Sequence, residues 1–162
     1  MSQSQARMEL AQFRQVAPQV GAALQSLSQA AVGAGLEKDL LELAKLRASQ
    51  MNGCAFCIQY HLNDARRLGV PTEKLDLVVA WAEAGVFSER ETAALAWTET
   101  LTALMAKGVP DAAYEAAARH FSEKELAFLT AAIGTINVWN RIGVAYRFTP
   151  PVPRSAKTAN AA

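Results

Sequence analysis

The sequence predicts an all-α fold, a single-domain bundle of about seven or eight helices, and three observations lead to this prediction. Apolar residues recur at spacings of three and four, in segments rich in alanine, leucine and long polar residues. No stretch alternates apolar and polar residues with the period of two that a half-buried strand shows. The 162 residues, 51% of them hydrophobic, fit one domain with one core.

Glycine and proline residues divide the chain into these helical segments. The predicted breaks lie at Gly33 and Gly35, Asn52-Gly53, Gly69 with Pro71, Gly85, and Gly108 with Pro110. Thr72 is predicted as the N-cap of the helix that Gly85 ends, and a short helix is expected over 111–120.

Two capping boxes mark the starts of two later helices. Ser88 is followed three residues later by Glu91, and Ser122 is followed in the same way by Glu125. In this arrangement each side chain accepts a hydrogen bond from the backbone N–H of the other residue. The second box predicts a long helix that reaches Tyr146.

The helical domain is expected to span residues 1–148. The remaining segment, 149–162, is rich in proline and small polar residues, and we predict that it is disordered. The most apolar stretch, 126–139, contains polar residues and is typical of a core helix rather than of a membrane span. The N-terminus lacks the apolar run of a secretory signal, so we expect a cytoplasmic protein without a membrane partner.

Charge and composition indicate neither a nucleic-acid partner nor an organic cofactor. Sixteen Lys and Arg residues balance fifteen Asp and Glu residues, whereas nucleic-acid binding needs a basic face. The glycine-rich stretch around 33–35 follows no predicted strand, so it is too weak a pattern to indicate phosphate binding.

Three reactive side chains share one face of the helix predicted after Asn52-Gly53. At 100° per residue, Cys54, Cys57 and His61 fall within about 60° of arc. The same face carries the apolar residues Ile58, Ala65 and Leu68. Both cysteines lie near the helix N-terminus, where the macrodipole favours a thiolate, and His61 is one turn beyond Cys57. This pattern favours redox chemistry.

Glu42 is the predicted proton-exchanging partner of these groups. It lies in the middle of a segment that is apolar around most of its circumference, as in a buried helix. Burial is expected to raise its pKa towards neutrality, in range for proton exchange. The alternative is an exposed glutamate or one paired with a lysine.

Structural and metal-binding interpretations of the cysteine pair remain open beside the redox one. Two cysteines three apart close too small a ring to remove much chain entropy, so a stabilising disulfide is disfavoured. Two inert core thiols are a second alternative. A zinc site of Cys54, Cys57, His61 and His120 is a third, although His120 lacks a second histidine nearby and is favoured as a helix-end residue.

Several large or polar residues are expected to be structural. Asn137, Asn140 and Arg141 lie in an otherwise apolar segment, where a hydrogen-bond network or a subunit contact is favoured over catalysis. The aromatic residues expected in the core or in an interface are Trp81, Trp97, Phe128 and Trp139.

The spacing of the four reactive residues resembles the signature of a known family. Glu42, Cys54, Cys57 and His61 stand as in the alkylhydroperoxidase D-like (AhpD-like) branch of the carboxymuconolactone decarboxylase superfamily. Residues 43–54 and the run Asn137-Val-Trp-Asn140-Arg141 also resemble that family, and the resemblance spans about 40–145.

The resemblance implies an all-helical homotrimer or homohexamer that acts as a thiol-dependent peroxidase. It implies that the Cys57 thiolate attacks a small-molecule hydroperoxide and becomes a sulfenic acid, which Cys54 resolves to an intramolecular disulfide. His61 and Glu42 are then the proton relay, and a dithiol or lipoyl-type donor is the reductant. The best-known peroxidases of this branch carry a histidine where Phe56 stands here.

Two other functions remain open beside the peroxidase. The first is a general disulfide oxidoreductase that uses the same two cysteines. The second is a redox-sensing or zinc-binding helical module without turnover. Lactone decarboxylation, the chemistry of the other branch of the superfamily, is disfavoured because that branch lacks the cysteine pair.

Overall fold

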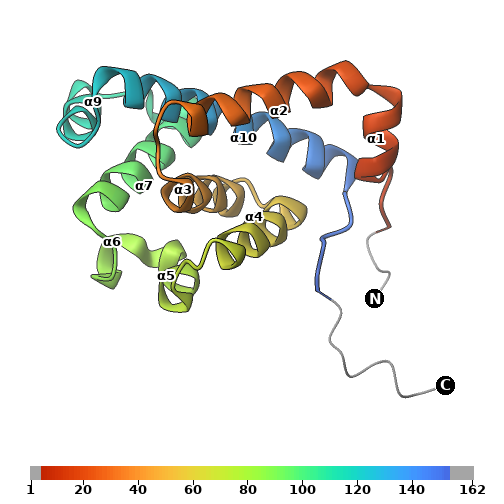
Figure 1. The fold of residues 1–162 in the computed structure, drawn as a ribbon, viewed down its shortest axis with the longest axis horizontal. Helices are drawn as coiled ribbons and strands as arrows, with labels where there is room; N and C mark the ends of the chain where they lie inside the picture. Colours follow the sequence, from red (N-terminus) through yellow and green to blue (C-terminus); the bar gives the residue numbers. More distant parts are fainter. Residues whose placement is uncertain (1–4, 154–162) are drawn as a thin grey trace.

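The computed structural model describes residues 5–153 and is helical throughout, without a strand in that range (Figure 1). This confirms the predicted fold class. The described part of the chain contains ten α-helices and one 3-10 helix. Their bounds are α1 Leu10–Val16, α2 Pro18–Gly33, α3 Lys38–Met51, α4 Ala55–Arg67, α5 Thr72–Leu77, η1 Val78–Ala80, α6 Trp81–Ala84, α7 Glu89–Thr102, α8 Leu104–Lys107, α9 Asp111–Ala118 and α10 Glu123–Tyr146.

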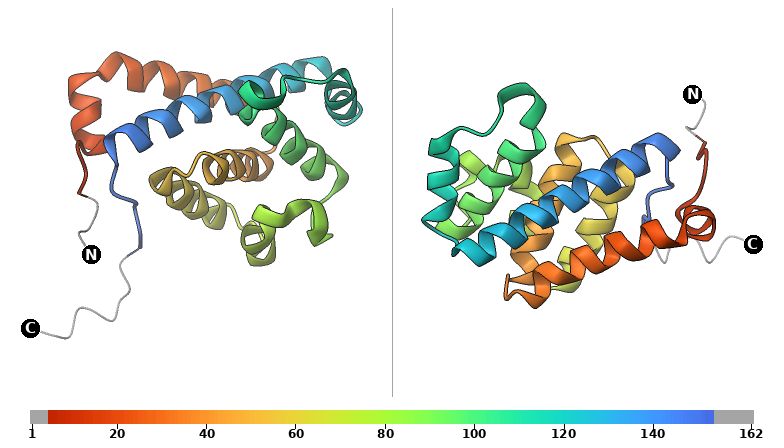
Figure 2. Two further views of the ribbon diagram at one scale, coloured as in Figure 1. Left: turned by 180° about the vertical axis from the view of Figure 1, so that it is seen from behind. Right: turned by 90° about the horizontal axis from the view of Figure 1, so that it is seen from above.

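Helix α3 lies at the centre of the bundle. It packs against α4, α7 and α10, while α2 runs alongside α10 on the outer side of the bundle (Figures 1 and 2). The sequence explains this position, because α3 is apolar around most of its circumference. Its buried residues are Leu40, Leu41, Glu42, Leu43, Ala44, Leu46, Ala48 and Ser49. Glu42 is therefore carried into the interior by its apolar neighbours.

The start of each later helix follows local chemistry, and the two predicted capping boxes are confirmed. The Ser88 and Ser122 side chains accept hydrogen bonds from the backbone N–H of Glu91 and Glu125. The side chains of these two glutamates in turn accept from the backbone N–H of the serines. Thr72 is not an N-cap, however. Pro71 takes that position and Thr72 is the first helical residue. Proline supplies the extended backbone of a cap without offering a side-chain acceptor.

Several predicted helices differ from the observed ones. The segment expected as one helix up to Gly85 is divided into α5, η1 and α6, and Gly85 ends α6 with a left-handed backbone. A proline at position 18 separates α1 from α2, a break that was not predicted. Helix α9 ends at Ala118 rather than at 120.

The first and last described residues meet at the C-terminal end of α10. The backbone N–H groups of Arg7 and Met8 donate to the Tyr146 carbonyl, and the Thr149 hydroxyl donates to Glu9 at 2.7 Å. Asn63 on α4 donates to the Pro151 carbonyl at 2.8 Å. The beginning of the predicted tail is thus bonded to the domain, whereas 154–162 lie outside the described residues. The domain boundary at 148 stays a prediction.

Within residues 5–153, no helix combines the length and the apolar character that crossing a membrane would require.

Candidate active site

Helices α3 and α4 bring two of the predicted residues into direct contact. The Nδ1 atom of His61 lies 2.7 Å from Oε2 of Glu42, and both side chains are buried. Glu42 comes from the middle of α3 and His61 from the inward face of α4, so the helix pair itself sets this distance. A buried carboxylate bonded to an imidazole can accept a proton and pass it on.

Lys45 is a third member of this group and was not singled out from the sequence. Its Nζ lies 2.8 Å from Oε1 of Glu42, one turn along α3. Burial raises the pKa of Glu42, but the hydrogen bond and charge of His61, together with Lys45, outweigh burial and lower that pKa below its ordinary value of 4.5. The expected rise in the pKa of Glu42 is therefore wrong, because burial does not act alone here.

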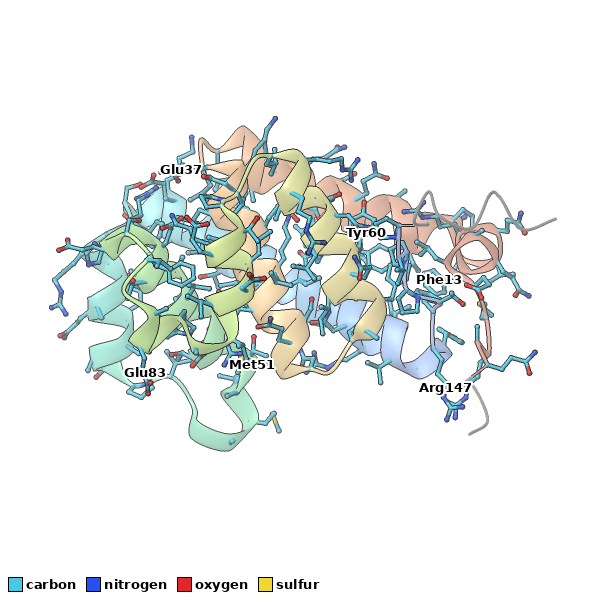
Figure 3. All side chains as sticks on the ribbon, turned by 90° about the horizontal axis from the view of Figure 1, so that it is seen from below. Phe13, Glu37, Met51, Tyr60, Glu83 and Arg147 are labelled. Atoms are coloured by element: carbon cyan, nitrogen blue, oxygen red, sulfur yellow. The ribbon has the colours of Figure 1, made fainter. Side chains whose placement is uncertain are left out.

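A cavity of about 230 Å³ opens beside this group. Glu42, Cys57 and His61 all line it, whereas Cys54 does not. Figure 3 shows Tyr60, another lining residue, on the side of α4 that faces the α1–α2 end of the molecule. The remaining lining residues are Leu10, Arg14, Gly21, Gln25, Ser28, Lys45, Phe56, Asp64, Ala132, Ile136, Trp139 and Phe148. The apolar part of the wall is aromatic and aliphatic. The polar and charged side chains come both from α3 and α4 (Glu42, Lys45, His61, Asp64) and from α1 and α2 (Arg14, Gln25, Ser28).

The two thiols lie at the start of α4, as predicted. Cys54 is the N-cap, and its Sγ accepts a hydrogen bond from the Cys57 backbone N–H at 3.3 Å. Cys54 is 1% exposed and Cys57 is 4% exposed, and both are free thiols. The inward face also carries Ala65, but Leu68, expected on that face, is 46% exposed because α4 has ended before it.

The hydrogen bond between the two thiols moves their pKa values in opposite directions. A hydrogen bond from the Cys57 thiol lowers the pKa of Cys54 to about 7, although burial raises it. The same hydrogen bond, burial and the charge on Cys54 raise the pKa of Cys57 well above its ordinary value. One thiolate therefore forms near neutral pH, held by the S–H of the other cysteine.

Two residues of α10, neither of which lines the cavity, enclose the cysteine pair. A Cβ atom built on Gly143 would lie 2.9 Å from Sγ of Cys54 and 3.5 Å from Sγ of Cys57. Asn140, one turn earlier, is fully buried, and hydrogen bonding from its side chain lowers the pKa of both thiols. Neither residue was assigned to the site from the sequence, although a glycine inside a helix is a known signal of close approach.

Aromatic side chains cover the cavity side of the thiols. Phe56 packs edge-on against Phe148 with ring centroids 5.5 Å apart and stacks on Tyr60 at 6.0 Å. Phe148 follows α10 and is buried. The position held by histidine in the best-known peroxidases is thus part of an apolar wall here.

The structure separates His120 from the other three residues of the zinc alternative. His120 precedes α10, whereas the thiols lie against Gly143, roughly 30 Å further along that helix at 1.5 Å per residue. Among the described residues, Glu42, His61 and Asp64 could offer ligand atoms within 4.8 Å of one another. The carboxylates of Glu42 and Asp64 already form ion pairs with Lys45 and Arg67, so side chains of the protein itself neutralise the charge that a metal ion would neutralise.

Comparison with known proteins identifies the family. The model of the carboxymuconolactone decarboxylase family matches residues 18–100. The uncharacterized protein YdfG of Bacillus subtilis (strain 168) is 35% identical over 133 residues, which are 82% of this chain and 90% of YdfG.

Solved structures agree with this assignment. The Agrobacterium tumefaciens protein ATU0492, of unknown function and described as a candidate antioxidant defence protein AhpD, is 37% identical with a TM-score of 0.85. The match covers 92% of this chain and all of that one. An alkylhydroperoxidase AhpD core from Ralstonia eutropha JMP134, an uncharacterized peroxidase-related protein, has a TM-score of 0.75 at 20% identity. That match covers 88% of this chain and 80% of the Ralstonia chain, and at this identity it shows only that the fold is shared. This protein therefore belongs to the carboxymuconolactone decarboxylase family, in the AhpD-like branch whose fold supports a peroxidase-related role.

Proposed function

We propose that the protein is a thiol-dependent peroxidase that reduces small organic hydroperoxides. One observation carries the proposal: Cys57, Glu42 and His61 line a single cavity, and Cys54 lies directly behind Cys57. The cavity therefore brings a substrate to one sulfur and to a proton acceptor at once. Its mainly apolar wall suits an alkyl or aryl hydroperoxide better than hydrogen peroxide.

The first half of the cycle oxidises Cys57. Cys57 gives its proton to the His61–Glu42 pair, and the resulting thiolate attacks the terminal peroxide oxygen. The S–O bond forms as the O–O bond breaks, and the leaving alkoxide takes the relayed proton to become an alcohol. Cys57 is left as a sulfenic acid, two electrons more oxidised.

The second half restores the thiols. Cys54 attacks the sulfenic sulfur of Cys57, an intramolecular disulfide forms, and the sulfenic oxygen leaves as water. A small dithiol donor of the lipoyl type then reduces the disulfide by thiol–disulfide exchange and is itself oxidised. Since only Cys57 lines the cavity, we expect the donor to attack Cys57 first.

Access, rather than acidity, selects the attacking sulfur in this proposal. Cys54 has the lower pKa, but it is enclosed by α10, whereas Cys57 borders the cavity. The S–H···S hydrogen bond lets the remaining proton of the pair lie on Cys54, so Cys57, which borders the cavity, can carry the charge during attack. A cytoplasmic location and assembly as a trimer or hexamer remain predictions.

A disulfide oxidoreductase that uses the same cysteines is the second candidate. Phe56 favours it, because this side chain contributes an apolar wall and cannot handle a proton beside Cys57. In that case a disulfide of another molecule, not a peroxide, oxidises the pair.

The test is consumption of cumene hydroperoxide with a dithiol donor. We expect turnover by the wild type, none by Cys57→Ser, and a single sulfenic acid per chain, trapped by dimedone, in Cys54→Ser. His61→Gln is compared with a control, His120→Gln. His120 lies outside the cavity, so the control variant should keep full activity. If both wild-type thiols survive the peroxide yet exchange rapidly with disulfides, the oxidoreductase replaces the peroxidase.

A further inference from the structure

Asn140 is a fully buried amide on α10 and does not line the cavity. It shares a face of α10 with Gly143, against which both sulfurs pack. The amide carries an acceptor, Oδ1, and two N–H donors on Nδ2. Which of these groups faces the sulfurs decides whether Asn140 attracts or repels a thiolate.

A first chain of hydrogen bonds fixes one side of the amide. Ser49 donates its only hydroxyl proton to the Lys45 carbonyl of α3, at 2.7 Å. Its oxygen can therefore only accept from Asn140, which lies 3.0 Å away. The Asn140 atom on that side must be Nδ2.

A second chain, independent of the first, fixes the other side. Asn137 lies 2.9 Å from the Ile133 carbonyl, which can only accept, so that Asn137 atom is Nδ2 and its Oδ1 faces Asn52. Asn52 must then donate through Nδ2, and it does so to Oδ1 of Asn137 and of Asn140, at 2.9 Å each. The Asn140 atom facing Asn52 must be Oδ1.

Both chains end on backbone carbonyls of helices and lead to the same orientation. Asn140 therefore has one N–H that neither Ser49 nor Asn52 uses, on the face of α10 where Gly143 packs against the two sulfurs. Hydrogen bonding from the Asn140 side chain lowers the pKa of Cys54 and of Cys57, in each case as a smaller effect than the bond between the thiols themselves.

We propose that Asn140 is the group that stabilises negative charge on the Cys54–Cys57 pair, and that Asn52 and Ser49 hold it as an obligatory donor. The inference concerns the thiols alone and does not depend on whether their oxidant is a peroxide or a disulfide. A thiolate gains from this donor and a disulfide does not, so Asn140 also makes the disulfide easier to reduce.

Other titratable groups near the pair lie on different sides. Glu42, His61 and Lys45 are on the cavity side, and Arg141 on α10 donates to the Asn137 carbonyl at 2.8 Å. None of these four residues is changed in the variants of Asn140. A change in the thiol titration would therefore be due to loss of the Asn140 amide.

The experiment is a pH titration of the reduced protein by the ultraviolet absorbance of the thiolate, with the reduction potential measured in parallel. Asn140→Leu removes the donor and should raise the pKa of the first thiol by about 1 or more, roughly tenfold less thiolate at a pH below it. Asn140→Asp keeps the shape of the side chain and should raise the pKa of the first thiol further, because a carboxylate repels a thiolate. In both variants the reduction potential should become more negative.

Thr135→Val is the matched control, since Thr135 is also buried on α10 but its hydroxyl binds only the Ala131 carbonyl. Its titration should match that of the wild type. Asn52→Ala and Ser49→Ala leave Asn140 in place but free it to turn, and should raise the pKa by a smaller amount.

A folded Asn140→Leu protein, checked by circular dichroism, that titrates like the wild type would overturn the proposal. If that variant does not fold, an unchanged titration of both Asn52→Ala and Ser49→Ala overturns it instead. The titration uses no peroxide. A protein that titrates as expected but leaves cumene hydroperoxide untouched therefore refutes the peroxidase and not the role of Asn140.

Discussion

The cavity side and the enclosed side of the cysteine pair are both buried and polar, yet they are built differently. On the cavity side, Glu42 is held between two groups that carry or can accept charge, His61 at 2.7 Å and Lys45 at 2.8 Å. On the enclosed side, the neutral amides of Asn52, Asn137 and Asn140 are fixed by hydrogen bonds that end on backbone carbonyls.

The difference matches two chemical tasks. A group that relays a proton must change its own charge, so it is placed among ionisable partners beside the substrate cavity. A group that stabilises a charge must not titrate, so a fixed neutral dipole suits it. Variants that affect one side without the other test this division of labour.

The largest expected effect comes from removing the proton acceptor. Glu42→Gln keeps the shape of the side chain but cannot take a proton, so peroxide turnover should fall by about 100-fold or more. The thiol titration should stay close to that of the wild type, since the enclosed side is untouched. Steady-state kinetics and the absorbance titration measure the two quantities.

Glu99→Gln is the control for that experiment. Glu99 also accepts bonds from partly buried partners, Arg47 and Trp81, but it does not line the cavity. It should keep wild-type turnover. Equal losses in the two variants would show that the effect of Glu42→Gln is structural.

The next largest effect concerns the close packing of α10 on the thiols. Gly143→Ala places a Cβ 2.9 Å from Sγ of Cys54. Overpacking costs about 1–3 kcal/mol, while alanine in a helix returns about 1 kcal/mol, so we expect a net loss of up to about 2 kcal/mol in the free energy of unfolding. Denaturant unfolding measures it.

Gly134→Ala, in the same helix, provides the contrast. A Cβ there meets no atom within 4 Å, so this variant should gain up to about 1 kcal/mol from helix propensity. If Gly143→Ala stabilises the protein as much as Gly134→Ala does, the sulfurs do not pack against α10 as closely as described.

The smallest effect is a shift in pH dependence. Lys45 helps to lower the pKa of Glu42, so Lys45→Met should raise that pKa. Because Glu42 acts as the carboxylate, the acid limb of the activity profile should then move to higher pH. The ionisation of the first thiol near pH 7, which also lowers activity as the pH falls, should not move. Kinetics across the acid range measure the shift.

Lys74→Met is the matched control. Lys74 forms a similar ion pair, 2.7 Å from the buried Glu91, away from the cavity. An acid limb that moves in this variant as well, or in neither variant, would argue against Glu42 as the group that sets it.

Local signals predicted the fold and part of the site. The serine–glutamate boxes at Ser88 and Ser122 specify helix starts within four residues, and the spacing of Cys57 and His61 places them on one face of one helix. Each of these patterns requires only neighbouring residues along the chain, so the sequence contains it in full.

What remained unpredicted depends on contacts between distant helices. Ser49 and Asn52 set the orientation of Asn140, and Cys54 packs closely against Gly143. No periodicity encodes such pairs. The prediction for the pKa of Glu42 was wrong for a different reason. Lys45, three residues further along the chain, could be recognised from the sequence as an ion-pair partner, and together His61 and Lys45 lower the pKa by more than burial raises it.

The packing of α10 and Phe148 over the thiols also bears on how the protein is made. A ribosome adds roughly 5 to 20 residues per second, so Phe148 is synthesised about 5 to 20 s after Cys57. Until then the nascent chain lacks both the amide that orders the sulfurs and the aromatic ring that covers them. The ability to form and control the thiolate thus comes with the completed chain, and the unfinished polypeptide carries two ordinary cysteines.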